Sequence, residues 1–499
     1  MGKQKIAIGA GALIDDAKKW NSIDWKYARR QVRRLQMRIA KAVKEGKYNK
    51  VKALQYLLTR SFYAKLLAVR RVTTNKGKNT PGVDGILWKG AGRKWWEAFN
   101  LKRRGYRPQP LRRIYIPKKN GKKRPLSIPT MYDRAMQALY KLALAPVAET
   151  TADRNSYGFR EGRSCADAVA AAFNALNKPN SATWVLEADI TGCYDNIAKG
   201  WMLENIPMDK EVLRKWLDTG YVENGITYPS HKGVPQGGII SPMLANMALD
   251  GLEGMIKSAV PRRSRVNFVR YADDFIVTGK SKRILEDNIK PVIEQFLSKR
   301  GLELSREKTF ITYVKDGFRF LGQSFRKDGG VLHITPSKEG VLALKRKLGT
   351  LIRKHVGAPM AVLIKKLNDL LRGWAYYHRH VVSSEAFSEV DSYVYDRLWD
   401  MIRRRHNSKS TGWLKDNYWS ASGKESVFAV KDKTKKGGET LYKVLRVSSI
   451  GIRRYIKIKA DANPYLPEYA GYYWRRRHDK ESKLLGAMSC REYKALKAA

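Results

Sequence analysis

The segment VNFVRYADDFIVTG, residues 266–279, constrains the fold of this chain more than any other. Two apolar, β-prone runs flank a pair of adjacent carboxylates, Asp273 and Asp274. The runs predict two strands of a hairpin with YADD as the tight connection, so that both carboxylates project at one edge of a sheet. Two adjacent acids repel each other unless a cation lies between them. We therefore expect a metal ion or a basic partner there, and an ordinary Asp-rich turn is the alternative.

A third carboxylate is predicted for the same place by WVLEADITGCYDNI, residues 184–197. An apolar strand ends there at Asp189, and a strand-end Asp beside a hairpin pair supplies the hard oxygen ligands that Mg²⁺ prefers. Two such ions about 3.5–4 Å apart can activate an attacking hydroxyl and stabilise a leaving pyrophosphate. Glu187 shares the strand face of Asp189 but lies roughly 6–7 Å back along the strand. We expect it behind the site or on the surface.

The charge of the chain indicates a polyanionic partner. Its 499 residues include 98 Lys and Arg against 46 Asp and Glu, a formal net charge of +52. The basic residues are spread among apolar segments, which favours nucleic-acid binding with counterion release over a basic tail. Residues 24–72 carry apolar side chains at helical spacing with Arg and Lys between them. They predict two or three basic amphipathic helices that contact RNA or DNA, and a solvated charged face is the alternative.

The remaining patterns divide the chain into four parts. Residues 1–85 form the basic helical extension, and residues 86–335 alternate short β-prone runs with helical ones. This alternation predicts an α+β fold with a mostly antiparallel sheet backed by helices. Residues 336–407 are predicted to be helical again. Residues 408–499 combine β-like runs with a polar helical tail.

Several classes of protein are excluded by what the sequence lacks. The three cysteines, Cys165, Cys193 and Cys490, lie far apart, so neither a disulfide framework nor a zinc site is indicated. No run of about 18 apolar residues predicts a membrane span. The amino terminus has no convincing signal peptide, and we expect a cytoplasmic protein.

Eight blocks follow one another between about residues 80 and 325: TPGVDG, KKRPLSIP, SYGFREGRS, ADITGCYD, VPQGG, YADD, GLELSREKT and FRFLG. In this order they resemble the blocks of a reverse transcriptase of the kind encoded by group II introns, also called intron maturases. Residues 363–380 are similar to the maturase region associated with the thumb. The resemblance implies a right-hand polymerase with fingers and palm in residues 86–335, a thumb/maturase domain in 336–407 and a DNA-binding region in 408–499.

The resemblance also implies roles for single residues near the acids. Asp189, Asp273 and Asp274 match the triad that binds Mg²⁺. Tyr194 matches the aromatic residue beneath the incoming sugar, where its ring would clash with a 2′-hydroxyl; a core tyrosine is the alternative. Lys308 in SREKT matches a lysine proposed to protonate the departing pyrophosphate.

Further residues match those that contact the nucleotide. Lys118 and Arg124 match the fingers residues that clamp the triphosphate, and the planar fork of Arg suits phosphate. Which lysine of this basic loop makes contact stays open, since such a loop is often only solvated. Gln236 and Gly237 in VPQGG match a loop whose glycines let the backbone approach the nascent base pair closely; a simple turn is the alternative.

Many relatives end in a DNA-binding segment followed by an HNH endonuclease with paired cysteines. Here YYWRRRH, residues 472–478, resembles the approach to that module, and only Cys490 follows. One Cys and His478 cannot form a tetrahedral zinc site, so we expect no cleavage of the second DNA strand. The rings and arginines of this segment suit DNA contact, and a solvated helix is the alternative.

These features imply an RNA-directed DNA polymerase that binds its intron RNA, assists splicing and copies the intron from dNTPs at a DNA target. One alternative is an RNA-binding splicing cofactor that uses the polymerase fold as a scaffold. The other is a domesticated relative in phage defence or CRISPR adaptation. The intact acidic triad favours the polymerase, and the RGWAYYHRH segment with the basic amino-terminal helices favours the intron role. The oligomeric state stays open.

Overall fold

A four-stranded antiparallel sheet lies at the centre of the fold. In the computed structural model, residues 10–478 are described except 118–120, 122, 231, 420, 423–424 and 434–437. The strand order is β6-β7-β3-β8. The strands are β6 (Asn267–Tyr271), β7 (Asp274–Gly279), β3 (Trp184–Ala188) and β8 (Phe310–Tyr313). β6 and β7 form the predicted hairpin, because Tyr271 pairs with Asp274 and only two residues connect them.

Both faces of this sheet are buried, and alternate residues of each strand point to opposite faces. On one face Phe268, Phe275 and Val277 join the largest buried cluster, together with helices α11, α12 and α13. On the other face Val269 and Ile276 pack with residues of α7. These helices are α7 (Cys165–Leu176), α11 (Ser241–Leu249), α12 (Leu252–Ser258) and α13 (Lys290–Ser298). The predicted α+β arrangement of an antiparallel sheet backed by helices is therefore confirmed.

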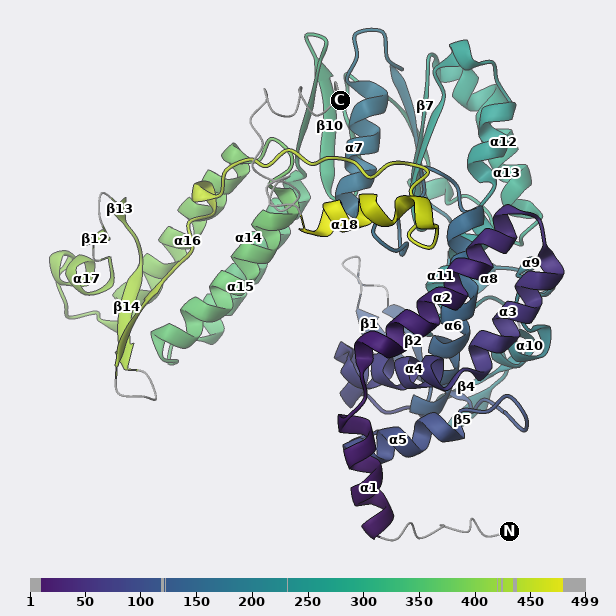
Figure 1. The fold of residues 1–499 in the computed structure, drawn as a ribbon. Helices are drawn as coiled ribbons and strands as arrows, with labels where there is room; N and C mark the ends of the chain where they lie inside the picture. Colours follow the sequence, from purple (N-terminus) through teal and green to yellow (C-terminus); the bar gives the residue numbers. More distant parts are fainter. Residues whose placement is uncertain are drawn as a thin grey trace.

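The amino-terminal helices pack against one long central helix, α6 (Met131–Thr151). The predicted basic helices are α2 (Trp25–Lys44), α3 (Tyr48–Arg60) and α4 (Phe62–Thr74), and they lie beside α6 in Figure 1. Asp24 caps α2, since its carboxylate accepts from the backbone of Lys26 and Tyr27. The Gln36 amide donates to the Leu142 carbonyl of α6 at 2.8 Å. The basic extension is thus fixed to the core through apolar contacts and buried amides.

A second sheet lies next to α6 and carries the basic loop. Its order is β2-β1-β4-β5. The strands are β1 (Leu111–Pro117), β2 (Lys123–Ile128), β4 (Tyr221–Glu223) and β5 (Ile226–Tyr228). β1 and β2 are antiparallel, whereas β4 runs parallel to β1. The β1–β2 hairpin brings β2 toward the central sheet.

Residues 336–407 form helices as predicted. They are α14 (Lys338–Lys354), α15 (Met360–His378) and α16 (Ser384–Arg405). Together with α17 (Thr411–Tyr418) and the β14–β15 hairpin (Ala429–Lys433 and Glu439–Lys443) they enclose a buried cluster of their own. In Figure 1 these elements form a lobe beside the rest of the molecule. Among the helices that the structure describes, none is long and apolar enough to cross a membrane.

The chain does not end in this lobe. After the β14–β15 hairpin it returns to the central part, where α18 (Ala470–His478) lies below α7 (Figure 1). The predicted β-like runs and the polar helix of residues 408–499 are present in the described part of that range. Cys490 lies outside the described residues, and Cys165 and Cys193 are free thiols.

Candidate active site at the edge of the central sheet

The strand register brings the three acidic residues to one edge of the sheet. Ala188, the last residue of β3, pairs with Phe275 of β7. Asp189 therefore follows β3 at the level of Asp274, which begins β7, and Asp273 lies in the turn before it. The backbone at Asp189 is held in place because the Asp189 carbonyl accepts a hydrogen bond from the Ser305 amide at 2.8 Å. The strand register thus brings residues that are far apart in the sequence to the same edge of the sheet.

The turn between β6 and β7 has a strained backbone. Ala272 has a φ of 60°, a left-handed conformation that favours glycine. Gly158 lies directly against it, and a Cβ at Gly158 would be 2.4 Å from the Ala272 nitrogen. The neighbouring Tyr157 amide donates to the Arg270 carbonyl at 2.8 Å. The SYGF segment thus lies along the edge of β6 and supports the catalytic turn, which we define as Ala272–Asp273.

A buried arginine forms the base of this turn. Arg270 is fully buried, and its guanidinium donates to the Asp250 carboxylate and, at 3.3 Å, to the Asn246 side chain. The Asn246 amide in turn donates to the Gly158 carbonyl at 2.6 Å. Our sequence reasoning missed this group. One indication of the role of Arg270 is present in the sequence: a charged residue occupies a strand position among apolar neighbours, which predicts a paired buried charge.

The acids strongly perturb one another. Burial raises the pKa of Asp273, and the charge of Asp189 raises it further. Burial and the charges of Asp189 and Asp273 raise the pKa of Asp274 to about 7. Lys308 forms an ion pair with Asp189, which raises the pKa of the lysine. The basic partner that two neighbouring acids require is therefore present as Lys308.

The donor set suits a divalent cation such as Mg²⁺, although the side chains do not enclose one. Among the described residues, no group of three or more His, Cys, Asp or Glu side chains is close enough to hold a metal ion. The site nevertheless offers only carboxylate oxygens, which are the ligands of hard cations. Burial raises the pKa values of Asp273 and Asp274 most, and the charges of the neighbouring acids raise them further, although Lys308 lowers both. A cation between these acids would relieve their mutual repulsion.

Two of the predicted nucleotide-contacting residues face the acids. Tyr194 lies in α8 (Cys193–Asn196), directly after the loop that follows Asp189. Burial raises the pKa of this half-buried tyrosine, and the charge of Asp273 raises it further. Arg124 is exposed on β2, and its positive charge lowers the pKa of both Tyr194 and Asp273. Arg124 is thus an exposed cation whose charge acts on Asp273, while Lys118 lies outside the described residues.

The VPQGG segment joins β2 to α8. The Gln236 carbonyl accepts from the Ser127 amide of β2 at 2.7 Å, and the Val234 amide donates to the Tyr194 carbonyl at 2.6 Å. Gly237 has a φ of 116°, and a Cβ there would be 2.4 Å from the Ser127 oxygen. Glycine is therefore required here because the backbones approach closely. The loop positions Tyr194 relative to β2.

Glu187 is held away from the acids by partners of its own. Its carboxylate accepts from the Thr312 hydroxyl at 3.0 Å and from the Arg319 amide at 3.1 Å. Its charge still contributes to the raised pKa of Asp274. This position agrees with the expectation that Glu187 lies behind the site.

Three family models match the chain in succession. They are the N-terminal domain of reverse transcriptase over residues 20–101, the reverse transcriptase (RNA-dependent DNA polymerase) over residues 116–325, and the group II intron maturase-specific domain over residues 341–419. The middle match contains every predicted site residue, from Lys118 to Lys308. The fold and the match together define a reverse transcriptase domain.

Curated relatives narrow the class. The group II intron-encoded protein LtrA of Lactococcus lactis is 32% identical over 340 residues, which cover 54% of this chain and 56% of the relative. Protein YkfC of Escherichia coli is 30% identical over 300 residues, which cover 51% of this chain and 78% of the relative. A putative COX1/OXI3 intron 1 protein of Saccharomyces cerevisiae is 25% identical over 368 residues, 60% of this chain and 43% of the relative. The match thus spans little more than half the length of LtrA. The chain belongs to the family of group II intron-encoded reverse transcriptases, or maturases.

Proposed function

We propose that this protein is an RNA-directed DNA polymerase encoded by a group II intron. It binds the intron RNA to assist splicing and copies that RNA into DNA at a target site. The observation that carries the proposal is the placement of Asp189, Asp273 and Asp274 at one sheet edge, with Lys308 paired to Asp189 and the charge of Arg124 acting on Asp273. Such an arrangement suits transfer of a nucleotidyl group, a reaction in which negative charge on the phosphates must be stabilised.

The proposed roles are those that the family resemblance implies, and the surroundings of each side chain support them. Asp189, Asp273 and Asp274 would hold Mg²⁺, and a bound pair of these ions would supply the positive charge that favours ionisation of the primer hydroxyl and offsets the charge of the triphosphate. Arg124 binds the triphosphate oxygens from β2, together with a lysine of the basic loop such as Lys118.

Other side chains select the nucleotide and complete the reaction. Tyr194 lies beneath the sugar and excludes a 2′-hydroxyl, and Gln236 and Gly237 position the nascent pair. Lys308, whose pKa is raised by Asp189, holds a proton that it can donate to the departing pyrophosphate.

The four parts of the chain receive matching roles in this proposal. Residues 1–85 and 336–407 bind intron RNA, residues 86–335 form fingers and palm, and residues 408–499 contact target DNA. The net charge of +52 supports a polyanionic partner on this scale. We place the protein in the cytoplasm, where it would meet the intron transcript.

Primer extension on an RNA template tests the polymerase directly. Wild-type protein with Mg²⁺ and dNTPs should extend a DNA primer, and a D273A/D274A variant should lose at least 1,000-fold in rate, on the order of 4 kcal/mol of barrier. Asp328→Ala removes an exposed carboxylate at the end of β10 (Gln323–Asp328) and is the matched control.

Splicing of the intron RNA is measured with the same proteins. The D273A/D274A variant should retain RNA binding and splicing assistance, because the acids lie apart from the basic helices. Equal loss of both activities in a folded variant would contradict separate sites. Absence of dNTP incorporation by the wild type, with splicing assistance intact, would leave the splicing cofactor as the function.

A further inference from the structure

The last described part of the chain is joined to the polymerase core by buried polar contacts. We define residues 453–478 as the C-terminal strap. It begins beside the C-terminal end of α15, where the Arg453 amide donates to the Arg379 carbonyl at 2.7 Å. It then crosses to α7 and ends as α18 (Figure 1). One side of α18 is buried at Tyr473, while Trp474 on another side is 60% exposed. The strap is therefore docked on the core, unlike the solvated helix that the sequence left open.

One carboxylate anchors the strap. Asp167, in the first turn of α7, is completely buried. It accepts from the Ile458 amide at 2.7 Å, from the Tyr455 hydroxyl at 3.1 Å and from the Arg476 guanidinium at 3.3 Å. Arg476 also donates to the Tyr455 hydroxyl at 2.9 Å. A buried charge with this many specific partners fixes the position of the strap, because any other position would leave the charge unpaired.

The strap also contacts the loop that precedes α7. We define residues 153–163 as the Arg-rich loop. Its Arg163 side chain, only 1% exposed, donates to the Arg154 carbonyl of the loop at 3.0 Å and to the Ala460 carbonyl of the strap at 2.8 Å. The Tyr473 ring packs on Gly162, where a Cβ would be 2.9 Å from a ring carbon. The loop and the strap thus share one guanidinium and one tight backbone contact.

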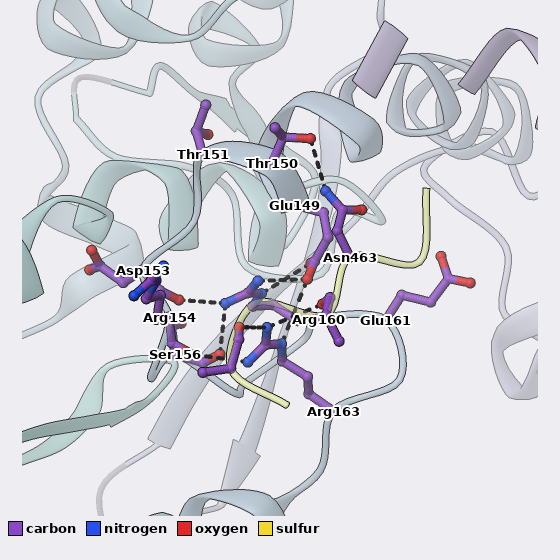
Figure 2. A network of polar contacts seen from close by, with 12 residues as sticks. Glu149, Thr150, Thr151, Asp153, Arg154, Ser156, Arg160, Glu161, Arg163 and Asn463 are labelled. Atoms are coloured by element: carbon purple, nitrogen blue, oxygen red, sulfur yellow. Dashed lines mark hydrogen bonds and ion pairs between the residues drawn. The ribbon is translucent and has the colours of Figure 1, made fainter. Parts of the chain in front are cut away.

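Arg160 ties the same loop to α6. It pairs with Glu149 and donates to the carbonyls of Asp153 at 2.6 Å and Ser156 at 2.9 Å, as Figure 2 shows. Phe159, beside it, has a φ of 56° and is 57% exposed. A non-glycine residue keeps such a conformation only where its surroundings enforce it. The ion pair and hydrogen bonds of the neighbouring Arg160 hold the loop at this point.

The Arg-rich loop in turn supports the catalytic turn. Arg270 of β6 exchanges backbone hydrogen bonds with it, since the Arg270 amide donates to the Asn155 carbonyl at 2.9 Å. Gly158 lies against Ala272, as described above. A continuous series of contacts therefore leads from Asp167 and the strap, through the loop, to the turn that carries Asp273.

From these contacts we infer that the C-terminal strap positions the catalytic turn. Arg476 and Tyr455 act on it through Asp167 and the Arg-rich loop, without touching a substrate. This role goes beyond nucleic-acid contact by residues 408–499, and it rests on the proposed polymerase only for its kinetic readout. In this view residues 453–478 belong to the structure that holds the catalytic turn in position.

Substitutions at the anchor test this inference. Arg476→Ala should lower kcat of primer extension about tenfold and change KM for dNTP by less than twofold, since positioning acts on the reacting geometry. Arg476→Lys keeps the charge without the planar fork and should recover part of kcat. Arg454→Ala removes an exposed arginine from the same strap and is the charge-matched control. Tyr455→Phe removes a single hydroxyl and serves if Arg476→Ala does not fold.

Hydrogen–deuterium exchange gives a readout that does not require activity. Arg476→Ala or Tyr455→Phe should speed amide exchange in the strap, in residues 155–158 and in residues 270–274, and leave α15 unchanged. The inference is overturned if the strap exchanges faster while the turn and kcat stay as in the wild type. It is equally overturned if neither variant loosens the strap. A wild-type protein without polymerase activity would refute the proposed function, and the exchange data would still decide this inference.

Discussion

The carboxyl of Asp274 lowers the stability of the folded protein when it is ionised. Its pKa is about 7, compared with an ordinary 3.8, because it is buried beside Asp189 and Asp273. The folded protein therefore holds this proton more tightly than the unfolded chain does. In metal-free solution, the contribution of this carboxyl to stability falls as the pH rises from about 4 to 7, where the folded state binds more protons.

Asp274→Asn removes this penalty. In buffer with a chelator at pH 8 we expect the variant to have a higher Tm than the wild type, by about 2 °C or more. At pH 4.5 the Tm difference should be much smaller, because the carboxyl is then protonated in the folded wild type and this pH lies close to the ordinary pKa of 3.8. Added Mg²⁺ should raise the Tm of the wild type and leave that of the variant nearly unchanged. Thermal melts at both pH values check this, with Asp328→Asn as an exposed control; an equal Tm difference at both would contradict the assigned cause.

The hairpin of β6 and β7 depends on an element that no local pattern links to it. The Arg-rich loop lies more than 100 residues earlier in the chain than the catalytic turn, yet its Gly158 backbone touches Ala272. Gly158 does not have a positive φ, so an alanine there is limited by space alone. The close approach makes this glycine as necessary to the turn as the residues of the turn itself.

Gly158→Ala should therefore displace the loop from the turn. We expect a loss of about 1–3 kcal/mol in the free energy of unfolding, typical of overpacking a filled site, and a fall of at least tenfold in kcat. Gly254→Ala, in α12, introduces the same methyl group with no atom within 4 Å and is the matched control. Denaturant unfolding and primer extension measure the two effects. A Gly158→Ala protein as stable and active as the control would show that the turn tolerates movement of the loop.

The elements that the sequence predicted correctly are those with local signals. Period-two apolar runs fixed β3, β6 and β7, and the strand-end position of Asp189 followed from the same pattern. Arg270, Gly158 and Asp167 were missed because their roles arise only from tertiary contacts. Nothing near Asp167 in the sequence predicts that a strap almost 300 residues later supplies its partners. The YYWRRRH segment is a related case, since its composition does not distinguish Arg476, which is half-buried in an ion pair with Asp167, from the exposed arginines beside it.

The arginines of α2, in the basic amino-terminal extension, differ in their exposure to solvent. In α2, Arg34 and Arg38 are exposed, whereas Arg33 lies over the Tyr465 ring of the strap at 4.5 Å. One helix thus carries both exposed arginines, which we propose contact nucleic acid, and an arginine that contacts the strap. Its exposed arginines are available for phosphate contacts, and Arg33 is not a suitable probe of them.

Charge reversal at Arg34 and Arg38 should therefore weaken intron RNA binding without disturbing the fold. Each lost phosphate contact lowers the slope of log Kd against log salt by roughly 0.7 to 0.9, so the double variant should lose about 1.5. Binding titrations between 50 and 300 mM salt measure this slope. An R262E/R263E protein carries the same charge change on exposed residues before β6 and should keep the wild-type slope if α2 is the RNA surface. Equal losses in both proteins would instead indicate a diffuse electrostatic field, and an unchanged slope for the α2 variant would make Arg34 and Arg38 part of a merely solvated face. Because Arg33 is left intact, its contact with Tyr465 of the strap is preserved, so a change in RNA affinity would not arise from loss of that contact.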